Sequence, residues 1–296
     1  MSWPPPRSSS ERPPRAGASA RHLVALLRPG QWPKSLVALL PLLDPGLAGW
    51  GALGRAALAA LAFVVASAVI YVANDIADRD RDRAHPVKRN RPIASGRVSL
   101  VTAGAVAAGL VVALVGIVGA SPALWWPLLT YLVINVAYCA GLKHLPLVDL
   151  FAVASGFVLR LVQGYVVLHA RPSAWLVLCV LSACLLLILG KRRHELGVAD
   201  AAHRPSLAGY NQHFVDHLLV LTAAVTLVAY QQHVTAFGTA ALLTVPCALF
   251  ALFRYLQAVL VRADGGNPVA VLLHDRVMVA NGVLWLLLLQ GGVLYG

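Results

Sequence analysis

Long apolar stretches separated by short polar segments dominate the chain. Nine of them approach the roughly 20 residues that a helix needs to cross a hydrocarbon core about 30 Å thick. They are residues 35–52, 56–75, 100–120, 124–141, 147–168, 174–190, 215–233, 237–257 and 273–294. The pattern predicts an all-α polytopic membrane protein. Its first stretch is the least regular, because Asp44-Pro45-Gly46 interrupts it.

Composition divides the chain into two unequal parts. Hydrophobic residues make up 59% of the sequence and charged residues 12%, whereas soluble domains are about half apolar and a quarter charged. Residues 1–27 are instead rich in Pro, Ser and Arg and contain no apolar core of a signal peptide, which predicts a disordered basic tail. Residues 28–296 then form a nine-helix transmembrane catalytic domain. The four cysteines show no metal-binding spacing.

The basic residues predict an orientation. With a cytoplasmic N-terminus, 21 of the 24 Lys and Arg residues fall in segments on the cytoplasmic side, Arg55 and Arg171 fall outside, and Arg160 lies within a span. We therefore expect a multi-pass protein of the cell (inner) membrane whose C-terminus is outside. The net charge of +12 lies in loops between apolar stretches, which argues against a nucleic-acid partner. A homo-oligomer is compatible with the pattern, which leaves the oligomeric state open.

Four aspartates follow the second stretch within eight residues, at positions 75, 78, 80 and 82. If the helix continues, Asp75, Asp78 and Asp82 project within roughly 60° of one another and Asp80 points to the opposite side. Three carboxylates on one face repel each other unless a cation lies between them. Hard oxygen ligands of this kind predict a Mg²⁺ site on the cytoplasmic side.

Basic residues come directly after the acids. Lys88, Arg89 and Arg91 are donors suited to phosphate oxygens, so acids and bases together predict catalysis with a departing diphosphate. A mixed-charge juxtamembrane loop is the alternative, because basic cytoplasmic loops are common in membrane proteins.

A second basic segment joins the sixth and seventh stretches on the same face. Its candidate phosphate ligands are Lys191 and Arg192, with Tyr210 further along and Glu195 as a candidate substrate or metal ligand. Elsewhere, Arg160 is an intramembrane charge, a type that usually faces a cavity or a partner. Lys34 precedes the first stretch and is a further candidate for substrate binding.

At these residues the chain resembles the UbiA superfamily of intramembrane prenyltransferases. That family has nine helices and an N-D-x-x-D-x-x-x-D motif after the second, matched here by Asn74, Asp75, Asp78 and Asp82. The resemblance implies that Asn74 contacts the substrate, that the three aspartates hold Mg²⁺, and that the rest of the chain from about Leu26 shares the fold.

One departure from the motif pattern indicates a branch of the family. UbiA-type aromatic prenyltransferases carry a second Asp-rich motif where this chain has Lys191-Arg-Arg-His-Glu195-Leu. The chain is more similar to the decaprenyl-phosphate phosphoribosyltransferase branch, which moves ribose 5-phosphate from phosphoribosyl diphosphate to a polyprenyl phosphate, in a route to cell-wall arabinan. The segments that carry this similarity are Arg28 to Lys34, His85 to Gly96, Leu147 to Asp149, Ser155 to Arg160, and Asp275-Arg276.

Ser35 departs from the Asn expected after Lys34 in that branch. Two rival functions remain open. One is an aromatic or quinone-precursor prenyltransferase with a prenyl diphosphate donor, and the other is a non-enzymatic lipid transporter or binder.

Overall fold

The computed structural model describes residues 19–44, 46–197, 205–262, 265–266 and 274–295. Within these ranges the chain forms helices and no strands. The longer elements are η1 (Pro29–Leu43), α2 (Trp50–Ala77), α4 (Leu100–Ala120), α5 (Trp125–Ala140), α6 (Val148–Val167), α7 (Ala174–Gly197), α8 (Gln212–Val234), α9 (Val245–Leu260) and α11 (Arg276–Tyr295). The shorter ones are α1 (Ala20–Leu26), α3 (Arg79–Ala84), η2 (Lys88–Asn90), η3 (Pro122–Leu124), η4 (Leu142–His144), η6 (Pro205–Gly209), η7 (Thr235–Phe237) and η8 (Thr239–Thr244).

Seven of the described helices are long and apolar enough to cross a membrane, and they coincide with the second to eighth predicted stretches. The chain is therefore a multi-pass, all-α membrane protein. The two outer stretches differ. The first is an irregular 3-10 segment, because Pro33 and Pro41 lie inside η1, and residues 50–52 of that stretch belong to α2. The last predicted stretch corresponds to α11, of which Arg276–Gly291 is apolar but short. A count of nine spans thus stays a prediction.

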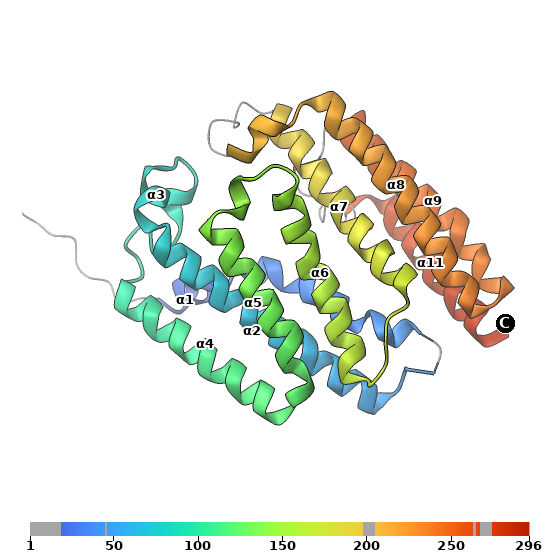
Figure 1. Cartoon of the computed structure of the whole chain (residues 1–296), viewed down its shortest axis with the longest axis horizontal. Helices are drawn as coiled ribbons and strands as arrows, with labels where there is room; N and C mark the ends of the chain where they lie inside the picture. Colours follow the sequence, from blue (N-terminus) through green and yellow to red (C-terminus); the bar gives the residue numbers. More distant parts are fainter. Residues whose placement is uncertain (1–18, 45, 198–204, 263–264, 267–273, 296) are drawn as a thin grey trace, which may run out of the picture.

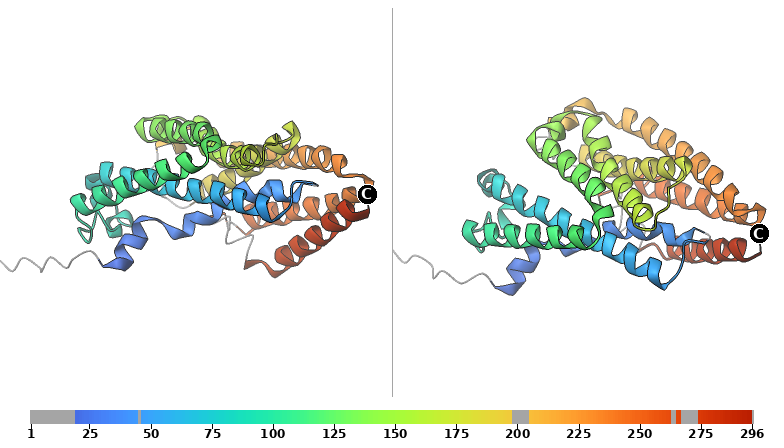
Figure 2. Two further views of the ribbon diagram at one scale, coloured as in Figure 1. Left: turned by 90° about the horizontal axis from the view of Figure 1, so that it is seen from below. Right: turned by 60° about the horizontal axis from the view of Figure 1, so that its bottom comes forward.

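The helices pack into two groups joined by α6. One apolar core lies among α2, α4, α5 and α6, with Phe63 and Leu128 at its centre, and a second lies among α7, α8 and α9. Figure 1 shows α4, α2 and α5 on one side of the molecule and α8, α9 and α11 on the other. Figure 2 shows α1 and η1 running beside α2. This arrangement brings α1 and the start of η1 to the end of α2 that carries the acidic motif.

A close backbone contact holds η1 against α6. A Cβ atom added at Gly164 would lie 2.2 Å from the carbonyl oxygen of Ala38, so only glycine permits this approach. The N-terminal segment also differs from the expected tail: residues 20–26 form α1, and Leu26 is fully buried beside Val72 and Ile93. Residues 1–18 lie outside the described ranges.

Candidate active site

The acidic motif does not lie on one continuous helix. α2 ends at Ala77, Asp78 adopts φ −89° and ψ 7°, and the six-residue α3 begins at Arg79. Backbone hydrogen bonds still cross the break, since the Asp78 N–H donates to the Asn74 carbonyl and the Asp82 N–H to the Asp78 carbonyl, both at 2.8 Å. The break redirects α3. The predicted common face of Asp75, Asp78 and Asp82 is therefore wrong for Asp78.

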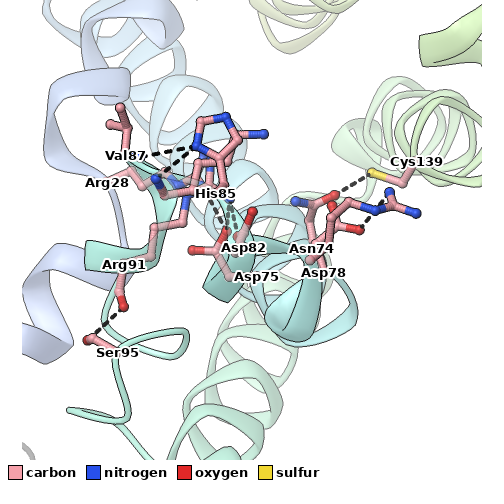
Figure 3. A network of polar contacts seen from close by, with 12 residues as sticks. Arg28, Asn74, Asp75, Asp78, Asp82, His85, Val87, Arg91, Ser95 and Cys139 are labelled. Carbon is pink, nitrogen blue, oxygen red and sulfur yellow. Dashed lines mark hydrogen bonds and ion pairs between the residues drawn. The ribbon is translucent and has the colours of Figure 1, made fainter. Parts of the chain in front are cut away.

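Asp75 and Asp82 meet at one guanidinium group. The Nη1 of Arg91 lies 3.0 Å from Asp75 Oδ1 and 2.7 Å from Asp82 Oδ2, and both carboxylates are almost fully buried (Figure 3). Arg91 reaches them from the segment after η2. Two acids that are seven residues apart in sequence thus share a single cation. We call them the Asp75–Asp82 pair.

A second guanidinium group completes this site. Arg28 Nη2 donates to Asp75 Oδ1 at 2.6 Å, and the guanidinium lies 4.7 Å from the centroid of the Tyr71 ring. Arg28 has a positive φ of 49°, which is uncommon for a residue with a side chain, and Pro29 follows it. Our site prediction did not include Arg28. The only signal was its place in the Arg28-to-Lys34 segment, because the contact with Asp75 spans 47 positions.

Asn74 and Asp78 lie on the other side of the same helix end (Figure 3). Asp78 is 3.6 Å from Lys143 Nζ and 3.6 Å from Arg81, while the Cys139 thiol donates to Asn74 Oδ1 at 3.3 Å. Asp80 is 86% exposed and pairs with Arg83, as its predicted opposite orientation requires. The aspartates therefore divide into a buried pair, one residue facing α5 and η4, and one at the surface.

Lys88 and Arg89 lie at the surface in η2. The His85 Nδ1 accepts the backbone N–H groups of Val87 and Lys88 at 3.2 Å, which fixes the turn leading into this segment. Lys88 and Arg89 lie on the loop that also carries Arg91, close in sequence to the acid pair.

The predicted phosphate ligand Arg192 is buried in an ion-pair network. Its Nη2 donates to Asp149 Oδ2 at 2.8 Å and its Nη1 to Glu195 Oε2 at 2.6 Å. Asp149 is fully buried at the start of α6. Lys191, by contrast, is half exposed and lies 3.8 Å from Glu195. Arg192 and Glu195 thus bind to each other inside the protein, whereas Lys191 remains accessible to solvent.

Tyr210 belongs to the same network. Its hydroxyl donates to Asp149 Oδ1 at 3.1 Å and accepts the Leu147 N–H at 2.6 Å. Burial, followed by the nearby Asp149 carboxylate, raises the pKa of Tyr210 to about 12, so the hydroxyl keeps its proton. Tyr210 therefore links the segment after η6 to the N-terminus of α6.

Arg160 is buried within α6 and surrounded by aromatic rings. Its guanidinium donates to the Gly156 carbonyl at 2.7 Å and to Ser67 Oγ at 2.8 Å, and it lies 4.9 to 5.6 Å from the centroids of three rings. Those rings are Phe63, Tyr131 and Phe157. Within the described ranges, no carboxylate forms an ion pair with Arg160, and its Nε has no hydrogen-bond partner.

Lys34 approaches Arg160 from η1. Its Nζ lies 6.0 Å from the centroid of Phe157, the same ring that Arg160 contacts. Burial is the main cause that lowers the pKa of Lys34 to about 8, and the positive charges of Arg160, Lys191 and Arg28 add to it. Cations from η1 and α6 thus lie beside the same aromatic ring.

The side chains around the acidic motif determine whether a divalent metal could bind here. Among the residues that the structure describes, no three Asp, Glu, His or Cys side chains gather as a group that could hold a metal. The Asp75–Asp82 pair nevertheless presents two carboxylate oxygens to a single positive charge. Such hard oxygen donors fit Mg²⁺, which commonly takes its other ligands from water and substrate phosphates.

Comparison with known proteins identifies the family. The model of the UbiA prenyltransferase family matches residues 36–274. The chain belongs to the UbiA prenyltransferase family. Decaprenyl-phosphate phosphoribosyltransferase from Mycobacterium tuberculosis is 31% identical over 293 residues, which cover 93% of this chain and 95% of that protein. The enzyme of the same name from Mycolicibacterium smegmatis is 32% identical over 313 residues, with 94% and 95% covered.

A solved structure shows the same fold. The UbiA homolog from Archaeoglobus fulgidus bound to GPP and Mg²⁺ superposes with a TM-score of 0.69 and 16% identity, covering 92% of this chain and 99% of that one. The resemblance to the UbiA family that the acidic motif indicated is thus confirmed. The roles of individual residues in this UbiA protein remain predictions.

Proposed function

We propose that the chain catalyses Mg²⁺-dependent transfer of 5-phosphoribosyl from phosphoribosyl diphosphate to a polyprenyl (decaprenyl) phosphate, with release of diphosphate. The observation that supports this most strongly is the identity of 31% to 32% with decaprenyl-phosphate phosphoribosyltransferases over nearly the whole of both chains. We place the active site on the cytoplasmic side of the cell inner membrane and the C-terminus outside.

The reaction exchanges one bond at C1 of the ribose. The bond between C1 and a diphosphate oxygen breaks, and its electron pair leaves with the diphosphate. A new bond forms between C1 and an oxygen of the lipid phosphate. That oxygen is already anionic at neutral pH, so the attack requires no proton transfer to a protein base.

The Asp75–Asp82 pair, with Asn74 and Asp78 beside it, forms the donor site in this proposal. Mg²⁺, when bound by Asp75 and Asp82, supplies positive charge that stabilises the departing diphosphate. Arg28 and Arg91 already lie at these carboxylates and bind diphosphate oxygens, while the surface residues Lys88 and Arg89 assist from the same loop.

Lys34, Arg160 and Lys191 form the acceptor site in this proposal. Arg160 carries a buried charge for which no described carboxylate compensates, and the lipid phosphate supplies the missing negative charge. Arg192 and Glu195 support this site indirectly, because their hydrogen bonds to each other and to Asp149 position the end of α7 that bears Lys191.

The experiment uses purified protein in detergent with radiolabelled phosphoribosyl diphosphate, polyprenyl phosphate and Mg²⁺, with and without EDTA. We expect label to enter the organic phase only with metal. An inactive Asp75→Asn variant and an active Arg55→Gln variant provide the matched comparison, because Arg55 lies at the opposite end of α2. Prenylation of an aromatic acid from prenyl diphosphate, without phosphoribosyl transfer, would instead assign the protein to the aromatic prenyltransferases.

A further inference from the structure

Arg28 and Arg91 place two guanidinium groups on the same carboxylate oxygen. Arg28 Nη2 is 2.6 Å and Arg91 Nη1 is 3.0 Å from Asp75 Oδ1, and the same Arg91 nitrogen is 2.7 Å from Asp82 Oδ2 (Figure 3). The acid pair is thus neutralised by cations that belong to the chain itself.

A divalent metal and these guanidinium groups compete for the same two carboxylates. A metal that takes Asp75 Oδ1 and Asp82 Oδ2 as ligands replaces the hydrogen bonds from Arg91, and at Asp75 also the one from Arg28. Diphosphate offers both arginines new partners, because guanidinium groups form bidentate hydrogen bonds with phosphate oxygens. The metal releases the arginines from the carboxylates, and diphosphate gives the released arginines new partners. Each ligand should therefore increase the affinity for the other.

We propose that Arg28 and Arg91 are exchangeable counter-ions that hold the Asp75–Asp82 pair and transfer to diphosphate when the metal and the diphosphate bind together. This inference rests on the metal–diphosphate site of the proposed function and adds a coupling between the two ligands. It also gives Arg28, which lies outside the acidic motif, a direct role in donor binding.

Arg28 and Arg91 differ from the buried Arg192 in a way that permits this exchange. The side chains of Arg28 and Arg91 are 28% and 26% exposed, whereas that of Arg192 is 3% exposed. Arg192 is enclosed with its two acids, but Arg28 and Arg91 reach the carboxylates from the edge of the site.

Coupled binding has a measurable signature. Because coupling is reciprocal, diphosphate should increase the affinity for metal by the same factor as the metal increases the affinity for diphosphate. A factor of about tenfold or more is typical of such coupling. Removing either arginine should make metal binding alone tighter, because a competing cation is lost, and should weaken the coupling.

The test measures binding at equilibrium with the full-length protein in detergent. Mn²⁺ is titrated alone and followed by the electron paramagnetic resonance signal of the free ion. Retention of radiolabelled inorganic diphosphate is then measured by dialysis, at a fixed free Mn²⁺ concentration and in EDTA. The variants are Arg28→Gln and Arg91→Gln, with Arg55→Gln as a control that removes the same charge from the far end of α2.

We expect Arg28→Gln and Arg91→Gln to bind Mn²⁺ alone about tenfold more tightly than the wild type, and metal to increase their diphosphate retention less. Arg55→Gln should match the wild type. Arg91→Lys keeps the charge on a shorter side chain without the guanidinium group, so its Mn²⁺ affinity should be intermediate, and it replaces Arg91→Gln if that variant fails to fold. Unchanged or weaker Mn²⁺ binding by the Arg28 and Arg91 variants overturns the inference.

These binding results are separable from the phosphoribosyl transfer. If the expected binding pattern occurs but no label reaches the lipid, the proposed reaction is wrong and the counter-ion exchange stands. If label is transferred but the arginine variants bind Mn²⁺ no more tightly, the reverse conclusion holds.

Discussion

Arg192 donates from Nη2 to Asp149 Oδ2 at 2.8 Å, in a site closed to solvent and across 43 positions of the chain. This ion pair joins the end of α7 to the start of α6. Glu195, Ser206 and Tyr210 add hydrogen bonds to it, so Ser206 and Tyr210 are attached to the bundle by a buried polar network. The network connects α6, α7 and the residues before α8, although the buried Arg192 Nε has no hydrogen-bond partner among the described residues.

The buried ion pair predicts that substitutions at the neighbouring residues Arg192 and Lys191 have different effects, the first on stability and the second on substrate binding. Arg192→Gln leaves the Asp149 carboxylate buried without its cation, which should lower the free energy of unfolding by about 3 kcal/mol. Lys191→Gln removes a half-exposed charge and should change stability by less than about 0.5 kcal/mol, while raising the KM for polyprenyl phosphate. Thermal unfolding in detergent and initial rates separate the two. Equal loss of stability in both variants would contradict the assignment.

Asp82 and Asp80 form a second matched comparison. Asp82→Asn removes a charge from the buried acid pair, and we expect turnover to fall by at least about 100-fold because stabilisation of the departing diphosphate is lost. Asp80→Asn changes an exposed side chain on the other face and should keep activity within about twofold of the wild type. Phosphoribosyl transfer at saturating Mg²⁺ measures both. Comparable activities would exclude Asp82 from the donor site.

The Tyr210 hydroxyl should stabilise the junction of α6 and the preceding turn. Tyr210→Phe leaves the Leu147 N–H without its acceptor and removes a donor to Asp149, so we expect about 1–3 kcal/mol of lost stability. Leu147→Gly retains the N–H, and its φ of 64° suits glycine, so it should destabilise less. Thermal unfolding in the same detergent shows which variant loses more stability. A larger loss in Leu147→Gly than in Tyr210→Phe would refute the role of the hydroxyl.

Lys34 predicts a pH dependence for the acceptor. Burial, aided by the neighbouring cations, lowers its pKa to about 8, so the side chain is charged at pH 7 and loses its charge as the pH rises through 8. The phosphate monoester is already a dianion over this range. The KM for polyprenyl phosphate should therefore rise between pH 7 and pH 9, while that for phosphoribosyl diphosphate stays flat.

Lys34→Arg is the control for this pH effect, because arginine keeps its charge throughout the range. Its KM for the lipid should be flat from pH 7 to pH 9. An identical rise in the variant and the wild type would show that another group causes the dependence.

The sequence by itself determined the membrane architecture and the position of the acidic site. Helices α2 and α4 to α9 coincide with predicted stretches because the length of an apolar segment and its backbone hydrogen bonding are local properties, which a membrane enforces. The motif from Asn74 to Asp82 was likewise visible, since its residues are neighbours in the chain. The irregular η1 was harder to predict, because its prolines disrupt the regular helix.

Only the tertiary structure decided which charges meet. The break at Asp78 pairs Asp75 with Asp82 and turns Asp78 towards Lys143, although a regular helix would have aligned all three acids. Arg28 reaches Asp75 across 47 positions, and Arg192 is enclosed with Asp149 across 43. Each arginine carries the same charge in the sequence. Its partner depends on how distant helices pack, because that packing fixes both the distance between charges and their exposure to water.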